Sequence, residues 1–268
     1  MRELIVGAFF LVLTAAGAHA LDRADLQKLT TTNSCSGCDL RGAKLQYQDL
    51  NDATLKGANL RDSFLKQVNL SNANLQTADL RRSDIEKATL ISANLDQAIL
   101  QEADLEKAVL TNATLKGADL RNTDFDNATI EGGQFLNADI REANFKRAIL
   151  TNADFTGAKL SDVNFKRATL IGAKLSDADL SNSNFTRADL SGARLDKTDL
   201  RYANFYRANL ADADFSAASL ANATFWGANL SGANFANVKG LEQGQLEAAC
   251  GDERTKLPGR IKLAKCDP

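Results

Sequence analysis

Residues 40–60 read LRGAKLQYQDLNDATLKGANL, with a leucine at every fifth position. The same count continues without a change of register to Phe235, and the fifth residue is always Leu, Ile or Phe. A small residue, usually alanine, stands two positions before it, as in Ala43-Lys44-Leu45. A period of five matches neither the 3.6-residue repeat of an α-helix nor the two-residue repeat of a strand. The large apolar residues can therefore share one interior only if the chain turns a corner in every pentad and coils around an axis.

The forty pentads from Ser36 to Phe235 resemble the pentapeptide-repeat family, whose unit is Ala-(Asp/Asn)-Leu-x-x. The resemblance implies an all-β fold, a right-handed quadrilateral (four-sided) parallel β-helix with one pentad on each side. It also implies twenty residues per coil, and hence about ten coils over residues 36–235. One coil cannot offset its backbone entropy by burying four large side chains, so coils must stack on one another and the ends need caps.

The phenylalanines give an independent check on the coil length. Counted in twenties, the ten at repeat centres fall into two columns: Phe125, Phe145, Phe165, Phe185, Phe205 and Phe225, then Phe135, Phe155, Phe215 and Phe235. Leu175 and Leu195 interrupt only the second column, which favours a period of twenty over one of ten. Because neighbouring coils should lie about 4.8 Å apart, rings in one column should stack. Gln48 alone puts a large residue at the small inward position, and we expect a local distortion there.

Residues 1–20 have the features of a secretory signal peptide. Arg2 precedes the apolar run Leu4–Ala16, and Ala18-His19-Ala20 provides a cleavage site of small residues. A membrane anchor is the alternative, but thirteen residues are too few to span a bilayer comfortably. We therefore expect cleavage and export, with no transmembrane segment left in the mature chain. The expected compartment is the bacterial periplasm, with secretion or a photosynthetic lumen as alternatives.

The segments flanking the repeats are expected to cap the rod. Residues 21–35 contain a predicted helix over Leu21–Thr32, whose leucines can cover the first coil. Residues 236–268 contain a second predicted short helix near Leu241–Ala249, followed by an irregular segment.

Four cysteines in an exported chain predict disulfide bonds. On a rod, Cys35 and Cys38 lie at one end while Cys250 and Cys266 lie at the other, too far away for a bond between the two pairs. The predicted pairing is therefore Cys35 with Cys38 and Cys250 with Cys266. For the Cys-Ser-Gly-Cys motif, a structural staple is the favoured interpretation, and a redox-active dithiol or a metal site are the alternatives.

Outward residues counted in twenties give four faces of different charge. The face beginning at Ser36 carries about five net negative charges and that beginning at Asn51 about three, whereas the face beginning at Arg41 is nearly neutral. The face beginning at Gln46 carries about four net positive charges, with a basic column of Lys87, Lys107, Arg147, Arg167, Arg187 and Arg207. Like charges on adjacent coils repel, and a polyanion, an anionic lipid surface or an acidic protein could offset that repulsion. Screening by salt and by neighbouring glutamates is the simpler explanation.

These observations select candidate residues for partner binding. They are Arg147, Arg167, Arg187 and Arg207 of the basic column, together with Trp226, the single tryptophan, which is expected to point outward. An uninterrupted rod predicts ladders of side chains and no cleft, and His19, the only histidine, would leave with the signal peptide. We therefore expect no enzyme activity, no catalytic residue, no cofactor, no metal site and no small-molecule substrate.

The predicted function is that of a rigid, exported scaffold or protein-interaction module of the cell envelope, acting on an unknown protein or envelope partner. A secreted effector is the alternative. Well-known members of the resembled family are cytoplasmic acidic rods that mimic DNA and bind topoisomerases. The present chain departs from them in its signal peptide, its near-neutral charge of −2 and its lack of an interrupting loop, so that role and a nucleic-acid partner are not expected. The sequence leaves the oligomeric state open.

Overall fold

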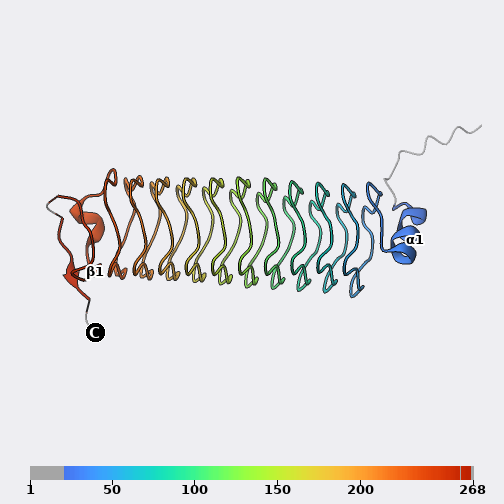
Figure 1. The fold of residues 1–268 in the computed structure, drawn as a ribbon, viewed down its shortest axis with the longest axis horizontal. Helices are drawn as coiled ribbons and strands as arrows, with labels where there is room; N and C mark the ends of the chain where they lie inside the picture. The colour runs from blue at the N-terminus through green and yellow to red at the C-terminus, as the bar shows by residue number, and fades with distance from the viewer. Residues whose placement is uncertain (1–20, 260, 267–268) are drawn as a thin grey trace, which may run out of the picture.

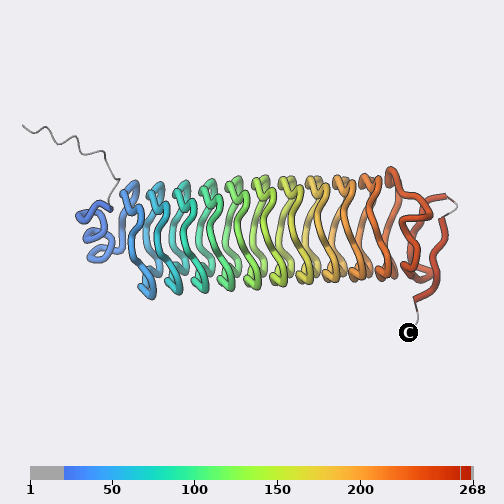
Figure 2. The backbone as a smooth tube through the Cα atoms, turned by 180° about the vertical axis from the view of Figure 1, so that it is seen from behind, coloured from blue at the N-terminus to red at the C-terminus, as the bar shows by residue number. Residues whose placement is uncertain are grey.

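The structure, a computed structural model, describes residues 21–259 and 261–266. The predicted signal peptide, residues 1–20, lies outside the described residues. A stack of coils of even size runs along the long axis of the molecule, with helix α1 (Arg23–Thr32) at one end and the C-terminal segment at the other (Figure 1). Viewed from behind, the stack continues without a protruding loop between the ends (Figure 2).

Neighbouring coils pair in parallel, always with a separation of twenty residues within the repeats. Asn59, for example, bridges Asp39 on one side and Asp79 on the other. The amide of Leu60 donates to the carbonyl of Asp79 at 2.7 Å, and the amide of Asn59 donates to the carbonyl of Cys38 at 2.8 Å. Two of every five residues form a turn, so a side is too short for an extended strand and the pairing consists of isolated bridges. The predicted parallel β-helix is confirmed.

The core consists of the two inward positions of each pentad. The predicted phenylalanine columns stack: ring centroids lie 4.6 Å apart in both the Phe125–Phe145 pair and the Phe135–Phe155 pair. The two columns also meet across the core, where the rings of Phe135 and Phe145 lie edge to face at 6.2 Å. The interior is therefore narrow enough for aromatic rings on two different sides to be in contact.

The structure differs from the expectation for Gln48. Its side chain is exposed, while its carbonyl still accepts from the amide of Asn69 at 2.9 Å. The expected distortion is absent from the backbone pairing, because the inter-coil hydrogen bonds hold the main chain while the long side chain turns outward.

Helix α1 covers the first coil. Asp22 begins it by accepting from the amide of Ala24 at 2.8 Å, a typical N-cap contact. Leu29 is buried, and Leu21 and Leu26 pack against the same core. No helix among the described residues is long and apolar enough to cross a membrane.

The C-terminal segment continues the pairing but not the period. Asn229 bridges Cys250 and Asn234 bridges Lys256, and the short strands β1 (Cys250–Gly251) and β2 (Ala264–Lys265) pair in parallel. The second predicted helix is reduced to one 3₁₀ turn, η1 (Gln243–Leu246). Ala248, which has a positive φ of 57°, ends the helical path after that turn, and Leu246 is buried in the core.

Candidate functional site

The arginine column on the face that begins at Arg41 is neutralised within the molecule. Arg141 pairs with Asp139 at 2.7 Å and Arg121 with Asp119 at 2.8 Å, and in both cases the carboxylate lies two residues earlier in the chain. The same pairing recurs at Arg41, Arg81 and Arg201. The hydrogen bond from Arg141 lowers the pKa of Asp139. These five guanidinium groups are therefore already occupied, whereas Arg61 of the same column has Asn59 in place of the aspartate and lies 4.0 Å from the carboxylate of Asp79.

The first part of the basic column on the face that begins at Gln46 is neutralised as well. Lys87 pairs with Glu86 and Lys107 pairs with Glu106. Glu86 also accepts from Lys66 of the preceding coil, and the hydrogen bonds from Lys66 and then Lys87 lower the pKa of Glu86 to about 2. A free positive surface is therefore not found in these coils.

The C-terminal part of the column is different. Together with Lys166 of the adjacent column it forms what we call the basic stripe: Arg147, Lys166, Arg167, Arg187 and Arg207. All five side chains are exposed. Within the described part of the chain, the charged groups of the first four form no ion pair or hydrogen bond. At about 4.8 Å per coil, the four arginines span roughly 14 Å along the rod.

A neighbouring column changes from Asp to Asn where the basic stripe begins. Asp84, Asp104 and Asp124 are followed one coil at a time by Asn144, Asn164, Asn184 and Asn204. Both residue types make the same local contact: the side chain of Asp104 accepts from the amide two residues on at 2.9 Å, and that of Asn204 does so at the same distance. The local turn is kept, and this column loses its negative charge. The glutamates that pair with Lys87 and Lys107 in the earlier coils directly precede them, and Lys146, Lys166, Thr186 and Tyr206 take their places before the arginines.

An aromatic stack adjoins the C-terminal end of the basic stripe. The rings of Tyr206 and Trp226 are parallel to within 5°, with centroids 5.1 Å apart. The guanidinium carbon of Arg207 lies 5.2 Å from the Tyr206 centroid and 5.6 Å from the Trp226 centroid. Trp226 is 45% exposed, and it also borders a shallow pocket of about 380 Å³. The pocket is lined by Asn222, Ala223, Thr224, Trp226, Glu242, Gly244, Gln245 and Glu247.

The sequence-selected residues thus form one continuous surface. Arg147, Arg167, Arg187 and Arg207 are in line, and Trp226 lies beside the end of that line, in the adjacent column that contains Lys166 and Tyr206. The pocket beside Trp226 was not anticipated, because half of its lining comes from the irregular segment after the last repeat.

Both predicted disulfide bonds are present, with Cα atoms 5.3 Å apart for Cys35–Cys38 and 4.7 Å apart for Cys250–Cys266. Asp25 lies close enough to the first pair to complete a set of three metal ligands. In the structure, however, those two sulfur atoms bond to each other and are not thiolates, which leaves one carboxylate and supports a local staple of residues 35–38. Asp25 itself joins α1 to the first coil by accepting from the amide of Asp39 at 2.7 Å.

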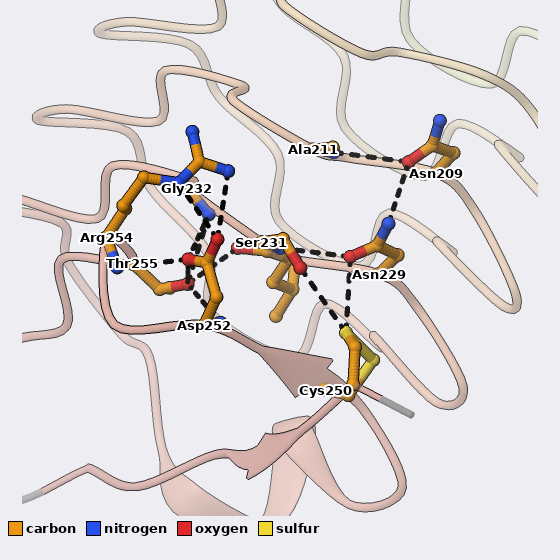
Figure 3. The surroundings of a disulfide bond; sticks show 11 residues. Asn209, Ala211, Asn229, Ser231, Gly232, Cys250, Asp252, Arg254 and Thr255 are labelled. Atoms are coloured by element: carbon orange, nitrogen blue, oxygen red, sulfur yellow. Dashed lines mark hydrogen bonds and ion pairs between the residues drawn. A yellow bond between two sulfur atoms is a disulfide. The ribbon is translucent and has the colours of Figure 1, made fainter. Parts of the chain in front are cut away.

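The surroundings of Cys250–Cys266 fasten the C-terminal segment to the last coils (Figure 3). Asp252 accepts from the amide of Gly232 at 2.8 Å, and Arg254 pairs with Asp252 at 2.9 Å and with Asp212 at 2.7 Å. These contacts keep the segment that carries the pocket residues against the repeats.

Comparison with known proteins places the chain in a family. The sequence model described as pentapeptide repeats matches in eight copies over residues 34–72, 49–86, 88–127, 134–167, 164–201 and 198–237. No curated protein matches the chain.

Solved structures with detectable similarity include three repeat proteins. HetL, a pentapeptide repeat protein involved in heterocyst differentiation regulation in the cyanobacterium Nostoc, is 29% identical, with coverage of 80% of this chain and 97% of HetL and a TM-score of 0.44. QnrB1, a plasmid-mediated fluoroquinolone resistance protein, is 17% identical, with coverage of 78% and 89% and a TM-score of 0.41. A pentapeptide repeat protein from the Arabidopsis thaliana thylakoid lumen is 30% identical, with coverage of 43% and 66% and a TM-score of 0.25.

The assignment rests on the repeat model, which matches well over half of the residues, and not on these structural scores. The chain belongs to the pentapeptide repeat family.

Proposed function

We propose that this protein is a non-enzymatic, exported interaction module of the cell envelope that presents its basic stripe to an acidic partner. In this proposal residues 1–20 are removed on export, and the mature chain is a right-handed, four-sided helix of about ten coils over residues 36–235. Residues 21–35 and 236–268 cap it. Binding occurs by surface complementarity, and no step requires a catalytic residue.

The observation that carries the proposal is the contrast between the two arginine columns. Five arginines of one column pair with aspartates. In the other column, the glutamates that directly precede and pair with Lys87 and Lys107 are replaced before the arginines by Lys146, Lys166, Thr186 and Tyr206, and the adjacent column changes from Asp to Asn. Because asparagine makes the same contact with the turn, folding does not require that change. The change does expose positive charge along one line, which suits a negatively charged partner.

The basic stripe costs stability in the isolated molecule. Like charges facing each other on adjacent strands destabilise by about 0.2–1 kcal/mol, and the four arginines form three such neighbouring pairs. Each arginine also occupies a turn position with positive φ, between 53° and 61°, a backbone conformation that glycine and asparagine adopt with less strain. Glycine or asparagine does fill the equivalent position in other pentads, such as Asn137 and Gly157. A bound anion would offset the repulsion.

The experiment compares partner capture by matched variants of the full chain. In the stripe variant, Arg147, Arg167, Arg187 and Arg207 are each replaced by asparagine, which tolerates the positive φ. In the control variant, Arg81, Arg121, Arg141 and Arg201 of the paired column are replaced by glutamine, so that the same number of charges is lost from another face. We expect the wild type and the control to retain the same partner from the envelope fraction and the stripe variant to lose it. Equal capture by all three would overturn the proposal.

Export is tested separately by cell fractionation and N-terminal sequencing of the mature chain. The proposal expects an envelope or external protein that begins at Leu21. A chain that stays in the cytoplasm with its first twenty residues attached would refute export.

A further inference from the structure

We infer that the acidic partner is an anionic polysaccharide with one carboxylate on each sugar ring, lying along the basic stripe with a further sugar stacked at Trp226. This inference rests on the proposed function and specifies the chemistry of the partner. Three features of the surface support it: the spacing of the cations, the aromatic stack beside the end of their row, and the hydrogen-bonding groups around both.

The cations form a single straight row with one arginine per coil. Consecutive guanidinium groups therefore repeat at about 4.8 Å, the separation of paired strands. One pyranose ring advances an extended glycan by a closely similar length. Because consecutive rings of an extended glycan face opposite sides, a chain of uronic acids places a carboxylate towards the row about every second ring. That repeat is close to two coils, so a carboxylate can lie opposite every second arginine, where the planar fork of the guanidinium can bind both oxygens.

Other anions fit this row less well. In an extended acidic peptide, side chains on one face repeat every second residue, or about every 6.7 Å. Four such acidic side chains would span roughly 20 Å, whereas the four arginines span roughly 14 Å. The phosphates of a nucleic-acid duplex wind away from a straight row. An anionic lipid surface would favour a broad basic area, whereas the stripe is narrow. Only Lys146 and Lys166 add positive charge in the adjacent column, Lys146 is paired with Asp126, and the column on the other side contains Asp189.

The aromatic stack provides an apolar surface where the row of cations ends. One face of Trp226 is covered by Tyr206, and Trp226 also borders the pocket. The C–H face of a pyranose ring packs well on an exposed indole, which remains amphipathic through its N–H group. Arg207 beside both rings holds the last cation of the row next to this platform.

The groups around the stripe and the platform suit hydroxyl groups. Within the described part of the chain, the side-chain NH₂ groups of Asn184 and Asn204 donate no hydrogen bond and are free to donate to a ligand. The pocket supplies the carboxylates of Glu242 and Glu247, which can accept from hydroxyls and would repel another anion. The sugar at Trp226 is therefore an uncharged one, next to the charged rings on the stripe.

The native protein contains a reporter for this site, because Trp226 is its only tryptophan. The probe is a polyuronate oligosaccharide, oligogalacturonate, titrated into the full exported chain at low salt. We expect saturable binding that changes the emission of Trp226 and weakens as salt is raised. By calorimetry, the stripe variant should bind at least tenfold more weakly, from the loss of the exposed charge contacts of the stripe. Trp226→Ala should weaken binding about tenfold, while the glutamine control should bind like the wild type.

Probes of matched charge separate the possible partner classes. Neutral cello-oligosaccharides should not bind. Stronger binding of polyglutamate, single-stranded DNA or anionic vesicles would overturn the inference. If the stripe variant loses its envelope partner but the wild type ignores the polyuronate, the proposed function stands and the glycan assignment fails. If the stripe variant keeps that partner, the proposed function itself fails.

Discussion

Replacing Phe145 by leucine should destabilise the rod more than the same replacement at Phe185, although both residues occupy one core column. Each ring is stacked between two others: Phe145 at 4.6 and 5.3 Å from its neighbours, and Phe185 at 5.1 and 4.9 Å. Phe145 additionally meets Phe135 and Phe155 edge to face at 6.2 and 6.1 Å. Phe185 has no such contact among the described residues, because the facing column there contains Leu175 and Leu195.

The difference between the two variants isolates the edge-to-face contacts. Both substitutions remove the same atoms from the same kind of site and both lose two stacked neighbours. Phe145→Leu also loses two edge-to-face pairs, each worth about 0.5–1.5 kcal/mol, so its free energy of unfolding should fall by about 1–3 kcal/mol more.

The assay is guanidinium denaturation of both variants and the wild type, followed by far-ultraviolet circular dichroism. Because coils contact only their neighbours, unfolding of a repeat protein can proceed in stages. The comparison is valid where the unfolding free energies of the three proteins depend on guanidinium concentration with the same slope. Equal midpoints, or a lower midpoint for Phe185→Leu, would show that contacts between the two phenylalanine columns contribute nothing beyond stacking.

Two further perturbations test the core and the ion pairs. Gly133→Ala should destabilise the fold by about 1–3 kcal/mol, even though alanine is the usual residue at this inward position. The added Cβ would lie 2.7 Å from Cγ2 of Ile130 and 3.1 Å from Cε2 of Phe135. An unchanged denaturation midpoint would contradict this prediction. Glu86 has a folded pKa of about 2, below its ordinary 4.5, so its ion pairs with Lys66 and Lys87 stabilise the fold above pH 4.5 and that stabilisation is lost as pH falls towards 2. The stability difference between wild type and Glu86→Gln should therefore shrink over that pH range, and a difference that stays constant would argue against the pairing.

The regular part of the fold could be predicted because one residue in five has a single role. A leucine or phenylalanine that must point inward at a constant interval leaves few paths for the chain, and the interruptions at Leu175 and Leu195 even indicated the coil length. The disulfide partners followed from the distance between the ends of a rod. The C-terminal segment has no such interval, so the short η1 turn and the pocket beside Trp226 depend on tertiary contacts that no local pattern specifies.

The position of the candidate site could be predicted from the sequence, but not which of its positive charges are neutralised by ion pairs. The sequence places Lys87 and Lys107 in the same column as Arg147 and Arg167, and only side-chain geometry separates the neutralised pair from the free pair. Part of that geometry is local and could have been used: a carboxylate directly before the lysine, as in Glu86-Lys87, forms an ion pair on the turn.

Rigidity explains how weak surface contacts can add up to specific binding on this rod. A single exposed ion pair contributes at most about 1 kcal/mol, which is too little to select a partner. On a flexible chain, several such contacts would also require the backbone to be ordered on binding. Here the inter-coil hydrogen bonds, such as those from Arg167 to Thr186 at 3.0 Å and from Arg187 to Tyr206 at 2.8 Å, fix the spacing of the cations before any ligand arrives. Only side-chain conformational entropy remains to be lost on binding. A ligand whose charges match the coil spacing, or a multiple of it, can therefore form its ion pairs simultaneously, whereas a ligand with another spacing can form one ion pair but not the others.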